Sequence, residues 1–154
     1  MPYLIDGNNV MDQAGMQSGD LAAARKRLIQ GLARFVAANR VKVKVVFDGT
    51  PGEEFPDGRS YRSVKILYAR PGSDADARIT DIIKKSSYRR DMILVTSDRA
   101  LESFARRQGA RVISAGKFRA MIKEAEDQLM AREKTGPPEP VDVEEWLDFF
   151  KSDK

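Results

Sequence analysis

Aspartates recur just after the apolar, β-branched runs of this 154-residue chain. Asp6, Asp48 and Asp98 each end such a run, and Asp74 and Asp76 follow shortly after another. The carboxyl ends of neighbouring parallel strands meet at one edge of a sheet, so we expect these carboxylates to converge there. Converging acids repel one another unless a cation lies among them, and Mg²⁺ or Mn²⁺ with oxygen ligands suits such a site.

The residue types that the chain lacks narrow the chemistry further. It contains neither cysteine nor histidine, which excludes disulfides, thiol catalysis and every serine–histidine–aspartate mechanism. Any hydrolysis must then use carboxylates, lysine, tyrosine or a metal-bound water, and the metal is the obvious activator of water. A net charge of +4 permits a nucleic-acid partner without proving one.

Each acid also has an ordinary structural explanation. Asp98 has the position of a helix N-cap, and Asp48 with Gly49 forms a common turn pair. Ser73 and Asp76 have the spacing of a capping box. For one acid alone this explanation is at least as good as a catalytic one. For all of them together, each at a strand end, the sequence favours a functional cluster.

Strand-like and helix-like segments alternate along the chain, which predicts parallel strands joined by crossover helices in a three-layer α/β/α sandwich. We expect Gly7 to form a turn, residues 11–19 to form a loop, and residues 49–60 to form a loop or an irregular hairpin. The predicted strands cover residues 3–6, 43–47, 63–69, 92–96 and 111–113, and the predicted helices cover residues 21–39 after Asp20, 74–87 after Ser73, 98–108 and 116–132.

Three rival functions for the first acidic segment fit poorly. A phosphatase of the haloacid type needs a second aspartate at the position of Asn8. A response-regulator receiver needs an acid beside Asp6, and a dinucleotide-binding domain needs a glycine-rich first turn.

Four segments resemble the motifs of the NYN nuclease domain, in its YacP-like branch, which is related to PIN domains. They are LIDGNNV at 4–10, VFDG at 46–49, ADARI at 75–79 and VTSDR at 95–99. The ISA segment at 113–115, followed by Phe118, is also similar. The resemblance covers about residues 3–130. It implies a PIN-like fold with a central parallel sheet of about five strands in the order 3-2-1-4-5, and a metal-dependent endoribonuclease of RNA.

The resemblance also implies roles for individual residues. Asp6, Asp76 and Asp98 are implied to bind Mg²⁺ or Mn²⁺, with Asp48 as an additional catalytic acid. One departure concerns Thr80, which stands where an acid often follows the alanine–aspartate motif.

Two asparagines complete the implied catalytic group. Asn9 matches the amide of the first motif, and Asn8 fills a neighbouring position that is often aromatic. Both are expected to hydrogen-bond the acids, a water or a phosphate oxygen.

RNA contacts are expected from basic and aromatic residues near the acidic edge. Tyr61 and Phe55 could stack on single-stranded bases, and Lys117 and Arg119 are further candidates. The alternative function is a non-catalytic RNA-binding module of the same fold. The candidate RNA-binding residues are Arg59, Tyr61, Arg62, Arg70, Arg78 and Arg99.

The end of the chain differs in character from its body. We expect an NYN/PIN-like nuclease domain over residues 1–133, a proline-rich linker over 134–141 and a short acidic amphipathic helix over 142–154. Its apolar face would dock on the body, on a second copy or on another protein, and the ribosome is a further candidate partner. Without a membrane-length apolar run or signal segment, we expect a cytoplasmic protein. The apolar face consists of Trp146, Leu147, Phe149 and Phe150.

Overall fold

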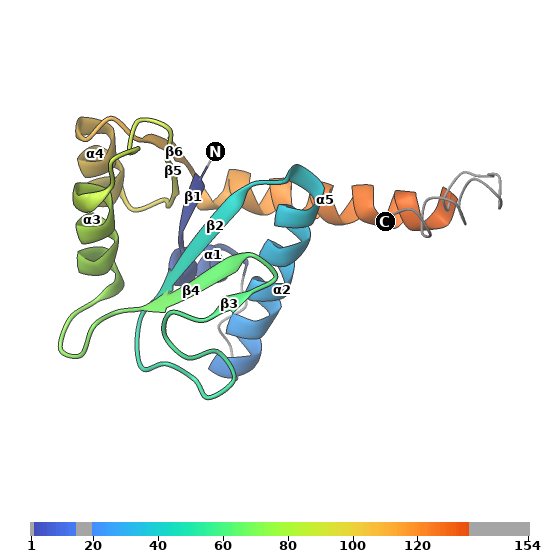
Figure 1. The fold of residues 1–154 in the computed structure, drawn as a ribbon, viewed down its shortest axis with the longest axis horizontal. Coiled ribbons are helices and arrows are strands. Elements are labelled where there is room, and N and C mark those ends of the chain that lie inside the picture. The colour runs from blue at the N-terminus through green and yellow to red at the C-terminus, as the bar shows by residue number, and fades with distance from the viewer. Residues whose placement is uncertain (1, 15–19, 136–154) are drawn as a thin grey trace, which may run out of the picture.

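A six-stranded sheet forms the centre of the molecule (Figure 1). The computed structural model describes residues 2–14 and 20–135. The elements in chain order are β1 (Pro2–Asp6), α1 (Gly7–Ala14), α2 (Leu21–Asn39), β2 (Lys42–Phe47), β3 (Ser60–Tyr61), β4 (Val64–Tyr68), α3 (Ala75–Lys85), β5 (Ile93–Val95), α4 (Arg99–Arg107), β6 (Arg111–Ile113) and α5 (Ala115–Thr135).

The strand order is β3-β4-β2-β1-β5-β6. Strands β4, β2, β1, β5 and β6 are all parallel, and they follow the order 3-2-1-4-5 that the family resemblance implies. The sixth strand, β3, pairs antiparallel with the outer edge of β4 and makes the sheet mixed. We expected residues 49–60, which are rich in turn formers, to form a loop or an irregular hairpin, and β3 with β4 forms a short hairpin here.

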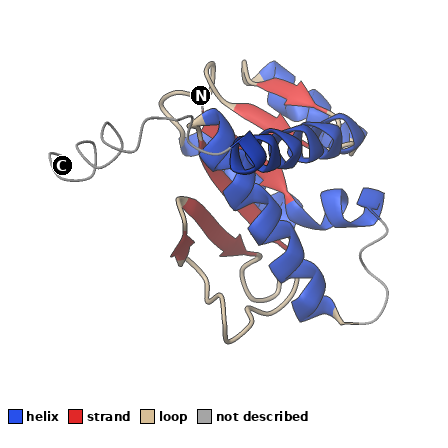
Figure 2. Cartoon of the chain, turned by 90° about the vertical axis from the view of Figure 1, so that its right-hand side faces the viewer, coloured by secondary structure: helices blue, strands red, loops and turns tan. Residues whose placement is uncertain are grey.

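Helices cover both faces of the sheet and confirm the three-layer architecture. Helices α3 and α4 lie on one face, and α1, α2 and α5 lie on the other (Figure 1). Figure 2 shows the molecule from the side of the two long helices. The rings of Tyr3, Phe35 and Phe118 pack together between α2, α5 and β1, with centroids 5.0–5.9 Å apart. No helix within residues 2–14 and 20–135 is both long enough and apolar enough to cross a membrane.

Two local predictions were wrong. The residues after β1 form helix α1 from Gly7 onward, where we expected a turn and a loop, because Val10 and Met11 are buried against the core. Gly7 has no positive φ, and its role is steric: a Cβ there would lie 2.6 Å from the ring of Phe47. Helix α3 is capped by Asp74, whose carboxylate accepts from the Ala77 amide, and not by Ser73.

Candidate active site

Four aspartates lie at the carboxyl edge of the parallel strands. Asp6 ends β1 and is only 5% exposed. Asp48 follows β2, and Asp76 stands in the first turn of α3. Asp98 is the N-cap of α4, directly beyond β5. The parallel topology therefore brings together the acids that the sequence placed at separate strand ends.

The Asp6 carboxyl has a pKa raised from its ordinary value of 3.8 to about 6. Burial is the largest cause, because the charged form loses its hydration. The nearby carboxylates of Asp76 and Asp48 raise the pKa further, while the Thr96 hydroxyl lowers it by donating a hydrogen bond of 2.9 Å to Asp6 Oδ2. Asp6 therefore keeps its proton until the pH rises to about 6, well above the ordinary range of an aspartate.

Asp76 experiences the same crowding of negative charge. Burial raises its pKa first, followed by the carboxylates of Asp98, Asp74 and Asp48. Within the described part of the chain, no lysine or arginine forms an ion pair with Asp6, Asp48, Asp76 or Asp98. No ion pair therefore relieves their mutual repulsion, although the charge of Asp48 does act on the buried guanidinium of Arg25, whose pKa burial lowers and Asp48 raises.

The two asparagines of α1 tie the edge of the sheet together. The backbone amide of Asp48 donates to Asn8 Oδ1 at 2.8 Å, and the amide of Ser97 donates to Asn9 Oδ1 at 2.7 Å. The first bond fixes the end of β2 and the second fixes the chain just beyond β5. Both amide oxygens are used to hold backbone, so these side chains position the segments that carry Asp48 and Asp98.

Two further hydrogen bonds extend this connection to the helices. The Ala75 amide donates to Asp48 Oδ1 at 2.7 Å, and the Ala115 amide donates to Ser97 Oγ at 3.0 Å. Asp98 Oδ1 accepts from the Leu101 amide at 2.9 Å. Asp98 is therefore the helix N-cap that its position predicts. Its second carboxylate oxygen is not used by this cap, so Asp98 can also belong to the acidic cluster. Helices α1, α3, α4 and α5 all begin at this edge, where their N-terminal dipoles favour anions.

The donor set of this edge fits a hard divalent cation. Its side chains offer carboxylate, hydroxyl and amide oxygens, the ligands that Mg²⁺ and Mn²⁺ accept. Among residues 2–14 and 20–135, however, no three acidic side chains stand close enough together to enclose a metal ion. Like charges move apart when no cation is present, so metal binding requires the side chains to turn toward one another.

Arg25 is a residue of this site that the sequence pattern did not reveal. It is buried in α2, and its guanidinium donates to the carbonyls of Asp48 at 2.5 Å and Thr50 at 2.9 Å. The same group lies 4.9 Å from the ring centroid of Tyr68 and 5.4 Å from that of Phe47. Burial lowers the pKa of Arg25. In the sequence it is one of several basic residues at helical spacing, and only contacts more than twenty residues away distinguish it.

Three of the predicted RNA-binding arginines lie at the acidic edge. A cavity of about 740 Å³ beside Asp48 is lined by Gly49, Arg70 and Arg78 among others. The Arg78 side chain is 15% exposed and donates to the Tyr68 carbonyl at 2.7 Å, whereas Arg70 is exposed and pairs with Asp81 at 3.5 Å. Arg99 is exposed at the first position of α4.

The structure does not bring the other aromatic and basic candidates to the acids. Tyr61 and Arg62 lie near the start of β4, at the opposite end of the strands, and Arg59 lies along the sheet edge opposite Ile66. Phe55 is 8% exposed and packs edge-on against Tyr61, so our expectation that it stacks on RNA bases was wrong.

Two remaining expectations concern the last helix and the end of the chain. Lys117 and Arg119 are exposed in the first turns of α5. The apolar face expected over residues 142–154 lies outside the described residues.

Comparison with known proteins agrees with this architecture. A crystal structure of Rae1 (YacP) from Bacillus subtilis matches 98% of this chain and 87% of its own, with a TM-score of 0.74 and 22% identity. A crystal structure of a mutant form matches 87% of this chain and 82% of its own, with a TM-score of 0.71 and 22% identity. At this identity the likeness establishes the shared fold.

No curated protein matches this sequence. The family model described as the YacP-like NYN domain, however, matches residues 3–147, which includes all four acids and both asparagines. The chain therefore belongs to the YacP-like NYN domain family, a nuclease-type family.

Proposed function

We propose that this protein is an endoribonuclease that hydrolyses RNA phosphodiester bonds with Mg²⁺ or Mn²⁺ held by Asp6, Asp76 and Asp98. The observation that carries the proposal is the electrostatic coupling at the strand ends. The carboxylates of Asp76 and Asp48 raise the pKa of Asp6, and those of Asp98 and Asp48 raise the pKa of Asp76. Groups of like charge with perturbed pKa values in one place are typical of a catalytic site.

The metal, when bound, supplies a water of lowered pKa and stabilises the charge that develops on the phosphate oxygens. The protein contributes the geometry. Thr96 orients the Asp6 carboxylate through its hydroxyl, and Asn8 and Asn9 fix the segments that present Asp48 and Asp98. In this proposal Asp48 would position the attacking water by accepting a hydrogen bond from it.

The substrate is bound through its phosphates in this proposal. The N-termini of α3 and α4 and the exposed arginines Arg70 and Arg99 surround the acids with groups that attract anions. Arg78 lies under this surface and fixes the end of β4 by donating a hydrogen bond to the carbonyl of Tyr68. We take single-stranded RNA as the substrate, because proteins recognise RNA mostly through unstacked segments whose bases and phosphates are accessible.

The direct test is incubation of the purified protein with single-stranded RNA in Mg²⁺ or Mn²⁺, with EDTA as the control. Internal cleavage that requires the metal and stops in EDTA is the expected result. Binding of RNA without metal-dependent cleavage would instead favour the alternative, a non-catalytic RNA-binding module of the same fold.

A further inference from the structure

Three lysines occupy an unusual place in the sheet. Lys42 and Lys44 lie on β2, which has β4 and β1 as neighbours, and Lys65 lies on β4, between β2 and β3. All three are exposed although their strands are interior. Lysine is depleted in strands, and an interior strand normally presents apolar residues to a covering helix.

The register shows that the three lysines share one face. Lys44 pairs with Leu4 on one side and with Lys65 on the other, and Lys42 stands two residues earlier on the same face as Lys44. Leu4 packs into the core beneath α3 and α4, as do Val46 and Leu67 farther along the strands. Helix α3 therefore covers this face at the acidic end and leaves it open where the strands begin.

The charges of these lysines are not compensated within the described part of the chain. No ion pair joins Lys42, Lys44 or Lys65 to an acid there. Like charges on adjacent strands are destabilising, and here they stand directly opposite each other at Lys44 and Lys65. A ligand that carries negative charge would relieve this repulsion.

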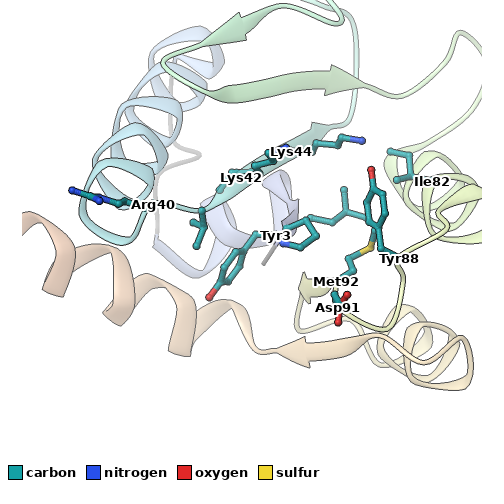
Figure 3. Close-up of a pocket in the computed structure, with 12 residues that line it drawn as sticks. Tyr3, Arg40, Lys42, Lys44, Ile82, Tyr88, Asp91 and Met92 are labelled. Atoms are coloured by element: carbon teal, nitrogen blue, oxygen red, sulfur yellow. The ribbon is translucent and has the colours of Figure 1, made fainter.

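A cavity adjoins the lysines and has an aromatic wall. Its volume is about 550 Å³, and its lining includes Lys42, Lys44, Ile82 and Tyr88. Tyr88 follows α3 and is 55% exposed, which is unusual for a large aromatic side chain. Figure 3 shows the two lysines extending toward Ile82 and Tyr88.

Two other charged residues of the lining point elsewhere. Figure 3 shows Arg40 turned away from the lysines, and Asp91 beside Met92 on the far side of the cavity. The three lysines and the tyrosine thus combine positive charge with an exposed ring. We call this surface the lysine face (Lys42, Lys44, Lys65 and Tyr88). That combination suits the phosphate and the base of a nucleotide.

We propose that the lysine face is a second RNA-binding site, at the end of the strands opposite to the acids. It takes a nucleotide unit of single-stranded RNA, with phosphates at the lysines and a base stacked on Tyr88. The inference rests on the proposed function, since it takes RNA as the substrate. Strand β2 spans roughly 20 Å, so an RNA that occupies both ends must extend several nucleotides beyond the cleavage site.

The test is RNA binding in EDTA, which prevents cleavage, measured by fluorescence anisotropy with a labelled single-stranded oligoribonucleotide long enough to reach both ends. The variant is Lys42→Gln/Lys44→Gln. The matched control is Lys26→Gln/Lys123→Gln, which removes the same charge from exposed lysines in surface ion pairs with Glu54 and Asp127. Circular dichroism checks that both variants are folded.

Loss of two phosphate contacts should make the slope of log K against log salt shallower by about 1.4 and weaken binding roughly 20-fold at about 0.1 M salt. The control should bind within about twofold of the wild type because its lysines lie elsewhere. Tyr88→Ala should weaken binding about tenfold through lost stacking. Tyr88→Phe, which keeps the ring, should restore it.

Three results would overturn the inference. The lysine variant and the control could bind equally well, or Tyr88→Phe could bind as poorly as Tyr88→Ala. AMP could bind the lysine face as tightly as the oligonucleotide does, which would make a free nucleotide the occupant. If the wild type cleaves RNA and the lysine variant binds normally, only this inference fails. If the wild type binds no RNA at all, the proposed function fails as well.

Discussion

Asp6 is the residue at which stability and the proposed chemistry conflict. Its carboxyl is buried, and its pKa is raised to about 6. The folded state therefore holds the proton of Asp6 more tightly than the unfolded state does. Ionisation of this group costs no stability below about pH 4, the cost grows as the pH rises from about 4 to about 6, and it levels off above pH 6, where Asp6 is ionised in both states. The difference from the ordinary value corresponds to about 3 kcal/mol of stability lost at neutral pH.

We predict that Asp6→Asn stabilises the protein in EDTA at pH 7.5 by up to about 3 kcal/mol, because it removes this charge while keeping an acceptor for Thr96. Near pH 4 the gain should vanish, since Asp6 is then protonated. Urea denaturation at the two pH values measures the difference, with Asp12→Asn, an exposed acid on α1, as the control. A gain that is the same at both pH values would contradict the explanation.

A second prediction concerns the hydroxyl that opposes this shift. Thr96 donates to Asp6 and lowers its pKa, so Thr96→Val should raise that pKa above 6. Because metal binding displaces the proton, the pH midpoint of Mn²⁺ binding should then move upward. Calorimetric titration across pH measures the midpoint. Thr80→Val is the control, since the Thr80 hydroxyl bonds only the Ala77 carbonyl of its own helix. An unchanged midpoint in Thr96→Val would count against the role of Thr96.

At the scale of elements, the junction between β1 and α1 organises the site. Helix α1 begins at Gly7 immediately after Asp6, and its first turn carries both asparagines that hold the neighbouring segments. The junction fits only because residue 7 is a glycine, since the ring of Phe47 occupies the space that a Cβ would need. The position of Asp6 thus depends on close packing between β1 and β2.

Gly7→Ala is therefore expected to destabilise the protein by about 1–3 kcal/mol, since overpacking displaces the ring or the strand end. Thermal or urea denaturation measures this change. Gly52→Ala is the matched control, because nothing lies within 4 Å of a Cβ at Gly52 and its φ is not positive. If both variants lose the same stability, the steric explanation for Gly7 is incorrect.

Elements with strong periodic patterns could be predicted from the sequence. Helix α2 and its cap Asp20 were correct to the residue, because apolar spacing and capping chemistry agree there. Helix α1 was missed, since its residues read as a turn and a loop and only tertiary packing makes them a helix, while β3 was anticipated only as part of a possible irregular hairpin. Arg25 was missed for a related reason, as its partners lie on a distant loop.

For the acids, the sequence predicted their shared edge correctly because parallel topology alone determines it. The hydrogen-bond partners of the residues around the acids depend on side-chain packing, which the spacing of residues in the sequence does not reveal. The asparagine side chains accept from backbone amides, the bond from this pair to Asp6 comes from the backbone amide of Asn9, and Asp98 serves as a helix cap while standing in the acidic cluster.

At the scale of the whole molecule, the sheet separates two opposite charges. The carboxyl ends of the strands carry the acids, and the open face near their beginnings carries the lysines. A polyanion held at the lysine face is kept near a site that repels it until a divalent cation is bound there. The fold shared with Rae1 (YacP) provides the frame for both ends.

In the proposed mechanism, Asp6, Asp76 and Asp98 hold the divalent cation that RNA cleavage requires. The most direct measurement is the rate of RNA cleavage in Mn²⁺ by the wild type, Asp6→Asn, Asp76→Asn and the control Asp12→Asn, all shown to be folded. Removal of a ligand should lower the rate by at least about 100-fold, since even changes beside a ligand cost 10–100-fold. The control should cleave at the wild-type rate. Cleavage by Asp6→Asn at the wild-type rate would contradict the claim.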